Sequence, residues 1–285
     1  MQLSPDYIKE RVLMLQYVKA QVHCALGLAL CLLLVAGGTA MAGEEGALTP
    51  EQMARAFGKV VFLSHVNTTD MPIFPGDPTP DLEPAFTVEE DGFALLVVTL
   101  GEHSGTHWGA PAHFNADEKT ADKLPATSFV FPAVVIDVRA KVAKDPDYAL
   151  SLADVQAYEK TNGRIPTHAM VIAYTGWDKR WDDPKAFFNE DENEIMHYPG
   201  IGIDATQWLI DNRALGGLGI DTHGVDPGAD ETYATNTALL KGDRIHLENL
   251  AGLGQLPAKG AWIVVGGVRN LNGSGSPATV LGFLP

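Results

Sequence analysis

Cysteine is scarce in this chain, and the little there is lies near the N-terminus. Cys24 and Cys31 are the two cysteines among 285 residues, and both fall in one apolar run. Residues 43–285 therefore offer no disulfide, no thiolate metal site and no cysteine nucleophile. Basic residues are also few, with 20 Lys and Arg against 36 Asp and Glu and a net charge of −16. A surface of that sign repels phosphate backbones, so the composition argues against a nucleic-acid partner.

The chain has one long hydrophobic run, and it precedes the residues whose composition predicts a globular domain. Three basic residues, among them Arg11 and Lys19, come before an uncharged stretch, residues 21–43, which has small residues at positions 40 and 42. This order predicts a secretory signal peptide over residues 1–42, cut after Ala42. The alternative is an uncleaved anchor, since such a run is long enough to span a bilayer. We expect an exported protein, periplasmic or extracellular, that meets a membrane only if this segment is retained.

The remaining residues show no internal repeat and no low-complexity linker, and they predict a single α/β domain. Ser151 is placed to cap a helix that runs to Lys160, and Asp204 to cap a helix over Ala205–Arg213. Short apolar runs bounded by Gly, Pro and Asp predict buried strands. These runs are Val60–Leu63, Phe93–Leu100, Ala133–Val138, Ala169–Tyr174, Leu218–Ile220 and Trp262–Val265.

Three of the nine histidines, His103, His107 and His113, fall within eleven residues. His103 and His107 are four residues apart, so both imidazoles face the same side in an extended or a helical backbone. A glycine and a proline in the segment argue against a continuous helix, which places it in a loop after the Phe93–Leu100 strand. Converging neutral imidazoles suit Zn²⁺, Mn²⁺ or Fe²⁺. A loop of hydrogen-bonded histidines without a metal is the alternative.

This segment resembles the signature of the cyclase-like metal-dependent hydrolases, which include kynurenine formamidases (arylformamidases) and isatin hydrolases. The signature reads His-x-Gly-Thr-His-x-Asp-Ala-Pro-x-His, and residues 103–113 match every fixed position but one. The resemblance covers residues 58–285, leaves residues 43–57 as a leader, and implies a compact domain with a swivelling β/β/α arrangement, in homodimers or homotetramers. Further matching stretches follow in order at residues 74–78, 175–178, 219–222, 225–228, 248–250 and 273–277.

The resemblance also implies roles for individual residues. His103 and His107 match metal ligands, and Glu248 matches a distal carboxylate ligand. His113 matches the residue that serves as general acid and base. Phe74 matches an aromatic residue that packs on the substrate.

Two positions depart from the family pattern. Gly109 replaces the carboxylate that bridges two metals in the formamidases, and Asn236 replaces a distal histidine ligand. Too few donors remain for a second cation, so we expect one divalent metal ion per chain, Zn²⁺ or Mn²⁺. If His103, His107 and Glu248 bind the metal, one coordination position of the ion would remain open for water.

Three other residues are weaker candidates. His223 lies in a loop that the family places near the site, where it is either an extra ligand, a substrate contact or a histidine bonded to the backbone. Trp108 is a second aromatic residue that would stack on an aryl substrate. His246 shares one side of a strand with Glu248, and a structural role is favoured for it over ligation.

Together these residues predict a metal-dependent hydrolase that cleaves the C–N bond of an amide, formamide or lactam in a small aryl substrate. A bound metal would activate water, and His113 would protonate the leaving nitrogen. A covalent serine mechanism is not expected, because Ser104 lacks the Gly-x-Ser-x-Gly elbow. The alternative is a secreted small-molecule-binding protein with a degenerate metal centre, which the losses at Gly109 and Asn236 favour and the retained ligands oppose.

Overall fold

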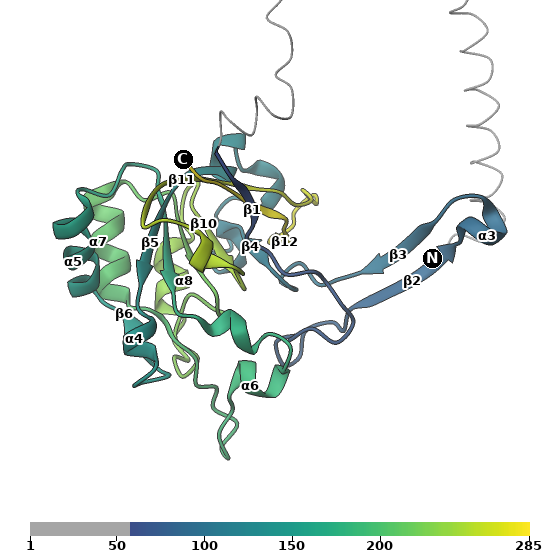
Figure 1. The fold of residues 1–285 in the computed structure, drawn as a ribbon, viewed down its shortest axis with the longest axis horizontal. Helices are drawn as coiled ribbons and strands as arrows, with labels where there is room; N and C mark the ends of the chain where they lie inside the picture. The colour runs from purple at the N-terminus through teal and green to yellow at the C-terminus, as the bar shows by residue number, and fades with distance from the viewer. Residues whose placement is uncertain (1–57) are drawn as a thin grey trace, which may run out of the picture. The chain divides into compact units, whose positions relative to one another are not determined.

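The computed structural model describes residues 58–285, so the predicted signal peptide and leader, residues 1–57, lie outside the described residues. Strands and helices alternate through the middle of the described chain (Figure 1). The strands are β1 Val60–Phe62, β2 Asp81–Phe86, β3 Leu95–Thr99, β4 His107–Gly109, β5 Val130–Asp137, β6 Ala149–Leu150, β7 Met170–Tyr174, β8 Gly200–Ile201, β9 Gly217–Ile220, β10 Ile245–Glu248, β11 Lys259–Val265, β12 Gly275–Pro277 and β13 Val280–Phe283. The helices are α3 Val88–Asp91, α4 Arg139–Val142, α5 Leu152–Asn162, α6 Pro184–Phe188, α7 Ile203–Arg213 and α8 Ala234–Leu239.

A mixed sheet forms the centre of the domain, in the order β1-β13-β11-β5-β7-β9-β10-β4-β12. Strands β5, β7, β9 and β10 form a block of parallel neighbours. The strands that flank this block, β11 beside β5 and β4 beside β10, pair with it in the antiparallel direction. The parallel strands are joined through helices, as such connections require. The fold class predicted from the sequence, a single α/β domain of the cyclase-like type, is confirmed.

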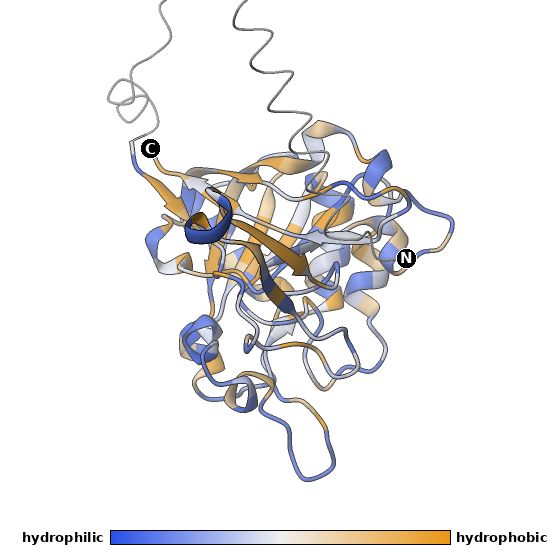
Figure 2. Cartoon of the chain, turned by 90° about the vertical axis from the view of Figure 1, so that its right-hand side faces the viewer, coloured by the Kyte–Doolittle hydropathy of each residue, from blue (hydrophilic) through white to orange (hydrophobic). Residues whose placement is uncertain are grey.

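Alternation along the strands divides the core into two layers. In β5, Val134 and Ile136 face the layer that contains α5 and α7, whereas Ala133 and Val135 face the other layer. Both sets are buried because helices cover one face of the sheet, while residues from loops and short helical turns, such as Leu124, Leu253 and Leu256, pack against the other. Figure 2 shows the hydrophobic colours concentrated in the strands and the hydrophilic colours in the peripheral loops.

Local capping rules account for α5 and only partly for α7. Helix α5 begins with the Ser151 capping box, in which the Ser151 hydroxyl and the Asp154 carboxylate each accept from the other's backbone N–H. Helix α7 begins at Ile203, two residues before the predicted start, and Gly202 is its N-cap without a side-chain bond. The Asp204 side chain therefore lies inside the first turn, where its charge is still favourable at the helix N-terminus.

Strands β2 and β3 form a hairpin arm, residues 81–99, that extends away from the central sheet (Figure 1). The prediction of a buried strand over Phe93–Leu100 is wrong in its burial, because every residue of β3 is exposed. An apolar run predicts a strand but does not say whether another element covers it. No helix within residues 58–285 combines the length and the apolar character needed to cross a bilayer.

Candidate metal centre and its pocket

The candidate site is built on two neighbouring antiparallel strands, β4 and β10. The register pairs His107 with Glu248 and Gly109 with His246. Residues directly opposite each other in such a pair share one face of the sheet. All four positions therefore face the same side, and the three side chains among them are almost completely buried.

Three imidazoles meet at this face. One ring nitrogen from each of His103, His107 and His246 lies within 4.8 Å of the other two, a separation that one metal ion can bridge. His103 arrives from the loop before β4, where Gly105 has a φ of +62° and turns the chain. The predicted closeness of His103 and His107 is therefore correct, but a turn rather than strand periodicity produces it.

The protonation of His103 is fixed by a chain of hydrogen bonds. Ser274 Oγ donates to Glu102 Oε2 at 2.9 Å, and a hydroxyl has one proton to give. Ser274 Oγ must therefore accept from His103 Nε2, which lies 2.9 Å away. His103 Nδ1 is then left with a free lone pair, and it is buried without a hydrogen-bond partner among the described residues.

His107 shows the same pattern. Its Nδ1 lies 3.0 Å from the Gly105 carbonyl oxygen, which can only accept, so Nδ1 carries the proton. Its Nε2 faces Glu248 Oε2 at 3.1 Å. A bare nitrogen beside a carboxylate oxygen is unfavourable unless a proton or a cation lies near both. Ligand histidines typically donate their second N–H to a protein oxygen in this way, so these residues fit a divalent metal ion.

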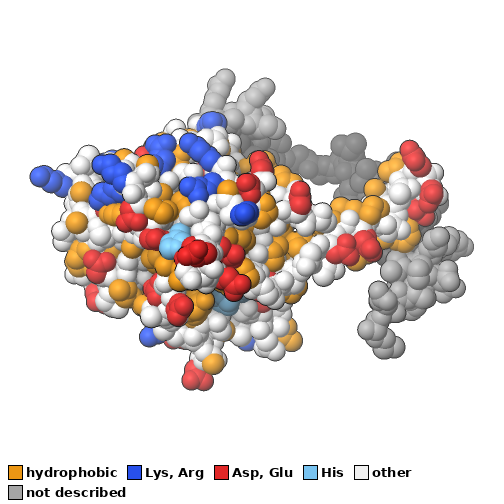
Figure 3. All heavy atoms as spheres, turned by 90° about the horizontal axis from the view of Figure 1, so that it is seen from below, with side chains coloured by type: hydrophobic (Ala, Val, Ile, Leu, Met, Phe, Trp, Pro, Cys, Tyr) orange, Lys and Arg blue, Asp and Glu red, His pale blue; other side chains and the backbone are white. Residues whose placement is uncertain are grey.

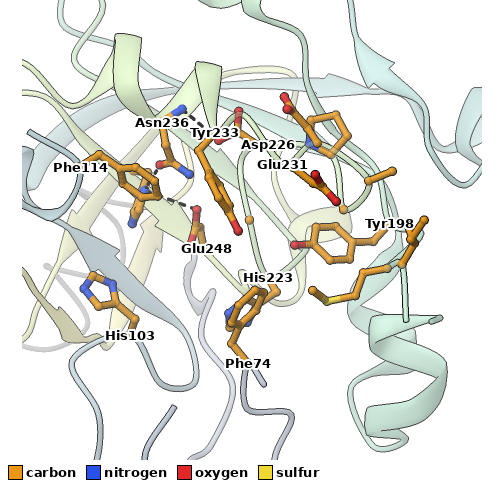
Figure 4. A pocket seen from close by; sticks show the side chains of 18 of the residues that line it. Phe74, His103, Phe114, Tyr198, His223, Asp226, Glu231, Tyr233, Asn236 and Glu248 are labelled. Carbon is orange, nitrogen blue, oxygen red and sulfur yellow. Dashed lines mark hydrogen bonds and ion pairs between the residues drawn. The ribbon is translucent and has the colours of Figure 1, made fainter. Parts of the chain in front are cut away.

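A cavity of about 560 Å³ opens onto the three histidines, and sequence-predicted residues line it. Phe74 stacks on His223, with ring centroids 5.0 Å apart and an interplanar angle of 13°. His113 is exposed to the cavity and stacks on His103 at 3.7 Å between centroids. Figure 4 shows Phe74 and His223 side by side on one wall, with Glu248 and Asn236 further in.

Trp108 does not reach this cavity, which corrects the prediction that it stacks on the substrate. Its side chain is 1% exposed and packs edge-on against Phe129 in the opposite core layer. The reason is strand parity, because successive residues of β4 point to opposite faces and His107 occupies the face of the site. His223 does face the cavity, but it lies outside the group of three histidines.

The cavity wall is acidic. Carboxylates line it, and none of the described lining residues is Lys or Arg. Burial raises the pKa of Asp226 to about 6, while burial lowers the pKa of His223 to about 3, which keeps that imidazole neutral. Figure 3 shows histidine and acidic side chains together near the centre of the face seen from below, with basic side chains towards one edge. The carboxylates are Asp77, Glu194, Asp226, Asp230, Glu231 and Glu248.

Comparison with known proteins decides the family. Residues 61–227 match the family model named Cyclase. The chain belongs to the Cyclase family. An isatin hydrolase from Roseibium aggregatum is 34% identical over 207 residues, which cover 69% of this chain and 78% of that protein. A kynurenine formamidase from Erythrobacter litoralis is 28% identical over 193 residues, which cover 66% of this chain and 77% of that protein.

A solved structure of a similar protein has the same architecture. The crystal structure of an isatin hydrolase bound to the product analogue thioisatinate superposes with a TM-score of 0.77 at 30% identity. The match covers 83% of this chain and 99% of that chain. The family membership expected from residues 103–113 is thus confirmed, and the fold extends well beyond that segment.

Sequence reasoning missed two contributors to this Cyclase-family site and ranked a third, His246, too low. Ser274 and Glu102 are 172 residues apart, yet they jointly set the protonation of His103. A structural role was favoured for His246, and the structure places it with His103 and His107 in a group that could hold a metal ion. The signal that strand parity gave for His246 was correct, because it does share the face of Glu248.

Proposed function

We propose that this protein is a metal-dependent hydrolase that cleaves the C–N bond of an amide, formamide or lactam in a small aryl substrate. The proposal depends mainly on the group of three imidazoles that lines a cavity of about 560 Å³, together with the aromatic side chain of Phe74 in the same cavity. The volume lies in the range of small-molecule sites. The relatives named isatin hydrolase and kynurenine formamidase support the same reaction class.

A single divalent ion, Zn²⁺ or Mn²⁺, would be held by His103 and His107 with a third ligand, for which Glu248 and His246 are the nearby candidates. When bound, such an ion supplies Lewis acidity and lowers the pKa of water to near 7. Glu248 Oε1 is held by the Val225 N–H at 2.9 Å, which fixes the carboxylate beside His107.

The other side chains of the cavity would donate a proton and bind the substrate. His113 reaches the cavity with an imidazole that has no hydrogen bond to another described side chain, so its ring nitrogen is free to hand a proton to the leaving nitrogen. Phe74 on His223 offers a flat stacked surface for an aryl ring. The acidic lining favours a neutral or cationic substrate over an anionic one.

The test is a turnover panel of N-formyl anilines, isatin and simple lactones, with the metal content of each preparation measured in parallel. Hydrolysis that needs stoichiometric metal supports the proposal. Tight binding of an aryl compound without turnover of any panel member would instead favour the alternative, a secreted binding protein with a degenerate centre.

We also propose that the protein self-associates through the hairpin arm. An isolated two-stranded hairpin is marginally stable in water, and Leu96 and Val98 of β3 are more than half exposed, at 54% and 52%. A hollow of about 690 Å³ at the base of the arm is lined in part by the apolar residues Phe62, Val66 and Val98. Arm and hollow on the same chain suit reciprocal contact between two copies.

Leu96→Glu should shift the protein to a smaller species in size-exclusion chromatography with light scattering. Ile203→Glu, which charges a comparably exposed apolar position on α7, should leave the mass unchanged. A monomeric wild type would refute the self-association.

The expected export of the chain rests on residues 1–42 alone, and it stays a proposal. Amino-terminal sequencing of the protein from its native host should begin at Gly43. A soluble protein that still begins at Met1 would overturn it.

A further inference from the structure

His246 occupies an unusual position for a buried histidine. It lies on β10 directly opposite Gly109 of β4, and its side chain is fully buried. A Cβ atom built on Gly109 would overlap His246 Nε2 and sit too close to Cε1 and Cδ2. The imidazole therefore occupies the space where any side chain at position 109 would begin.

The protonation of His246 is set from the other side of the ring. Its Nδ1 lies 2.7 Å from Asn236 Oδ1 and 3.4 Å from Glu248 Oε1. Both neighbours are oxygen acceptors, so Nδ1 carries the proton. Asn236 is held in place because Asp226 accepts from the backbone N–H groups of Thr235 and Asn236, at 2.7 Å and 3.0 Å.

This arrangement leaves His246 Nε2 with a free lone pair. The atom is buried, and no described residue forms a hydrogen bond with it. An unsatisfied buried polar atom costs about 1–3 kcal/mol. The cost is offset if Nε2 binds the same cation as His103 and His107, since one ring nitrogen from each of the three histidines lies within 4.8 Å of the others.

We infer that His246, not Glu248, supplies the third protein ligand, and that Gly109 and Asn236 are its two supports. Gly109 leaves room for the ring, and Asn236 holds it in the protonation state that can bind a cation. The inference rests on the proposed metal-dependent function, which it deepens. It accounts for both departures from the family pattern at once, as parts of one all-imidazole site. Three imidazoles are neutral ligands, so the bound cation would keep its full net charge. A set of two imidazoles and one carboxylate would reduce that net charge by one.

A double-mutant cycle for Zn²⁺ affinity separates this inference from a merely structural role. His246→Ala should weaken Zn²⁺ binding at least 100-fold in competition with a chromophoric chelator, because two imidazoles hold the ion poorly. Gly109→Ala should weaken it roughly 10- to 100-fold, because the new Cβ displaces the ring. In the His246→Ala background, Gly109→Ala should cost less than about threefold, since the ring is already gone.

Asn236 provides the second arm of the test. Asn236→Leu should weaken Zn²⁺ binding about 10- to 100-fold, and Asn236→Asp, which keeps an oxygen beside Nδ1, should restore most of it. X-ray absorption of the Zn²⁺-loaded protein should fit three imidazoles in the wild type and two in His246→Ala. Thermal denaturation of each metal-free variant checks that the fold is retained.

The failures can be told apart. If His246→Ala keeps wild-type affinity while Glu248→Ala loses the metal, the carboxylate is the third ligand, and the inference is wrong although the proposed function stands. If Gly109→Ala costs the same with and without His246, the glycine has another role and the coupling is refuted. If the wild type binds no Zn²⁺ at all, the proposed function fails together with the inference.

Discussion

Ser274→Ala tests whether a residue that touches no metal controls metal binding through the protonation of His103. In the wild type, the single Ser274 proton goes to Glu102, which forces His103 to place its own proton on Nε2. Without the hydroxyl, Nε2–H loses its acceptor, and the ring is free to rotate or to move the proton to Nδ1. Either change removes the free lone pair on His103 Nδ1, which is the ring nitrogen left without a hydrogen-bond partner among the described residues.

The expected magnitude follows from two independent figures. Loss of a partner for a partly buried donor costs about 1–3 kcal/mol. Loss of a residue that orients a ligand histidine typically weakens metal affinity 10- to 100-fold, which corresponds to about 1.4–2.7 kcal/mol. The two ranges overlap, so we expect Ser274→Ala to bind Zn²⁺ roughly 10- to 100-fold more weakly than the wild type.

The assay is chelator competition on metal-free protein, with ¹⁵N NMR of the imidazoles as a direct reading of the His103 tautomer. Ser274→Thr keeps a hydroxyl and should remain close to the wild type. Ser104→Ala is the matched control, because the Ser104 hydroxyl is also buried near the site but has no hydrogen-bond partner within residues 58–285. Affinity of Ser274→Ala within threefold of the wild type, or an unchanged His103 tautomer, would refute the reasoning.

Three further outcomes are expected. His113→Ala should slow hydrolysis of a panel substrate about 10²- to 10⁴-fold while metal content stays unchanged; metal loss would make His113 a ligand instead. Asp221→Ala should lower the free energy of unfolding by about 3 kcal/mol or more in urea titration, because the buried carboxylate accepts the N–H groups of residues 175–177. Hydrogen bonding to Asp147 raises the pKa of His197, so Asp147→Asn should lower it in an NMR titration. Since that pKa is raised on folding, the pair stabilises at low pH, and its contribution is lost as the pH rises through the raised value.

Much of the fold could be predicted because the central strands are apolar on both faces. Strands β5, β7 and β9 are buried on both sides of the sheet, so their sequences are continuous apolar runs bounded by turn residues. Helix α5 carries its own start in the Ser151 capping box. The arm was misjudged because β3 has the composition of a buried strand, and burial depends on neighbours that composition does not reveal.

The site was predictable only where its residues are close in sequence. His103, His107 and His113 form one motif, and the structure brings all three to one cavity. The partnership of His246 with Gly109 depends instead on the register between two strands separated by more than a hundred residues. In the sequence, Gly109 indicates only that a ligand is missing. The pairing of the two strands is needed to show that the His246 ring occupies the space of a side chain at position 109.

The order of the strands in the sheet also determines how much of the chain must be synthesised before the central sheet can fold. Strand β1, at the start of the described chain, pairs with β13 near its end, and β4 lies between the late strands β10 and β12. A nascent chain that lacks the last strands cannot close either end of the sheet, and it exposes unpaired edges that favour aggregation. Such long-range pairing also slows folding. We expect carboxy-terminal truncations that remove β13 to accumulate as insoluble chains rather than as shortened folded enzymes.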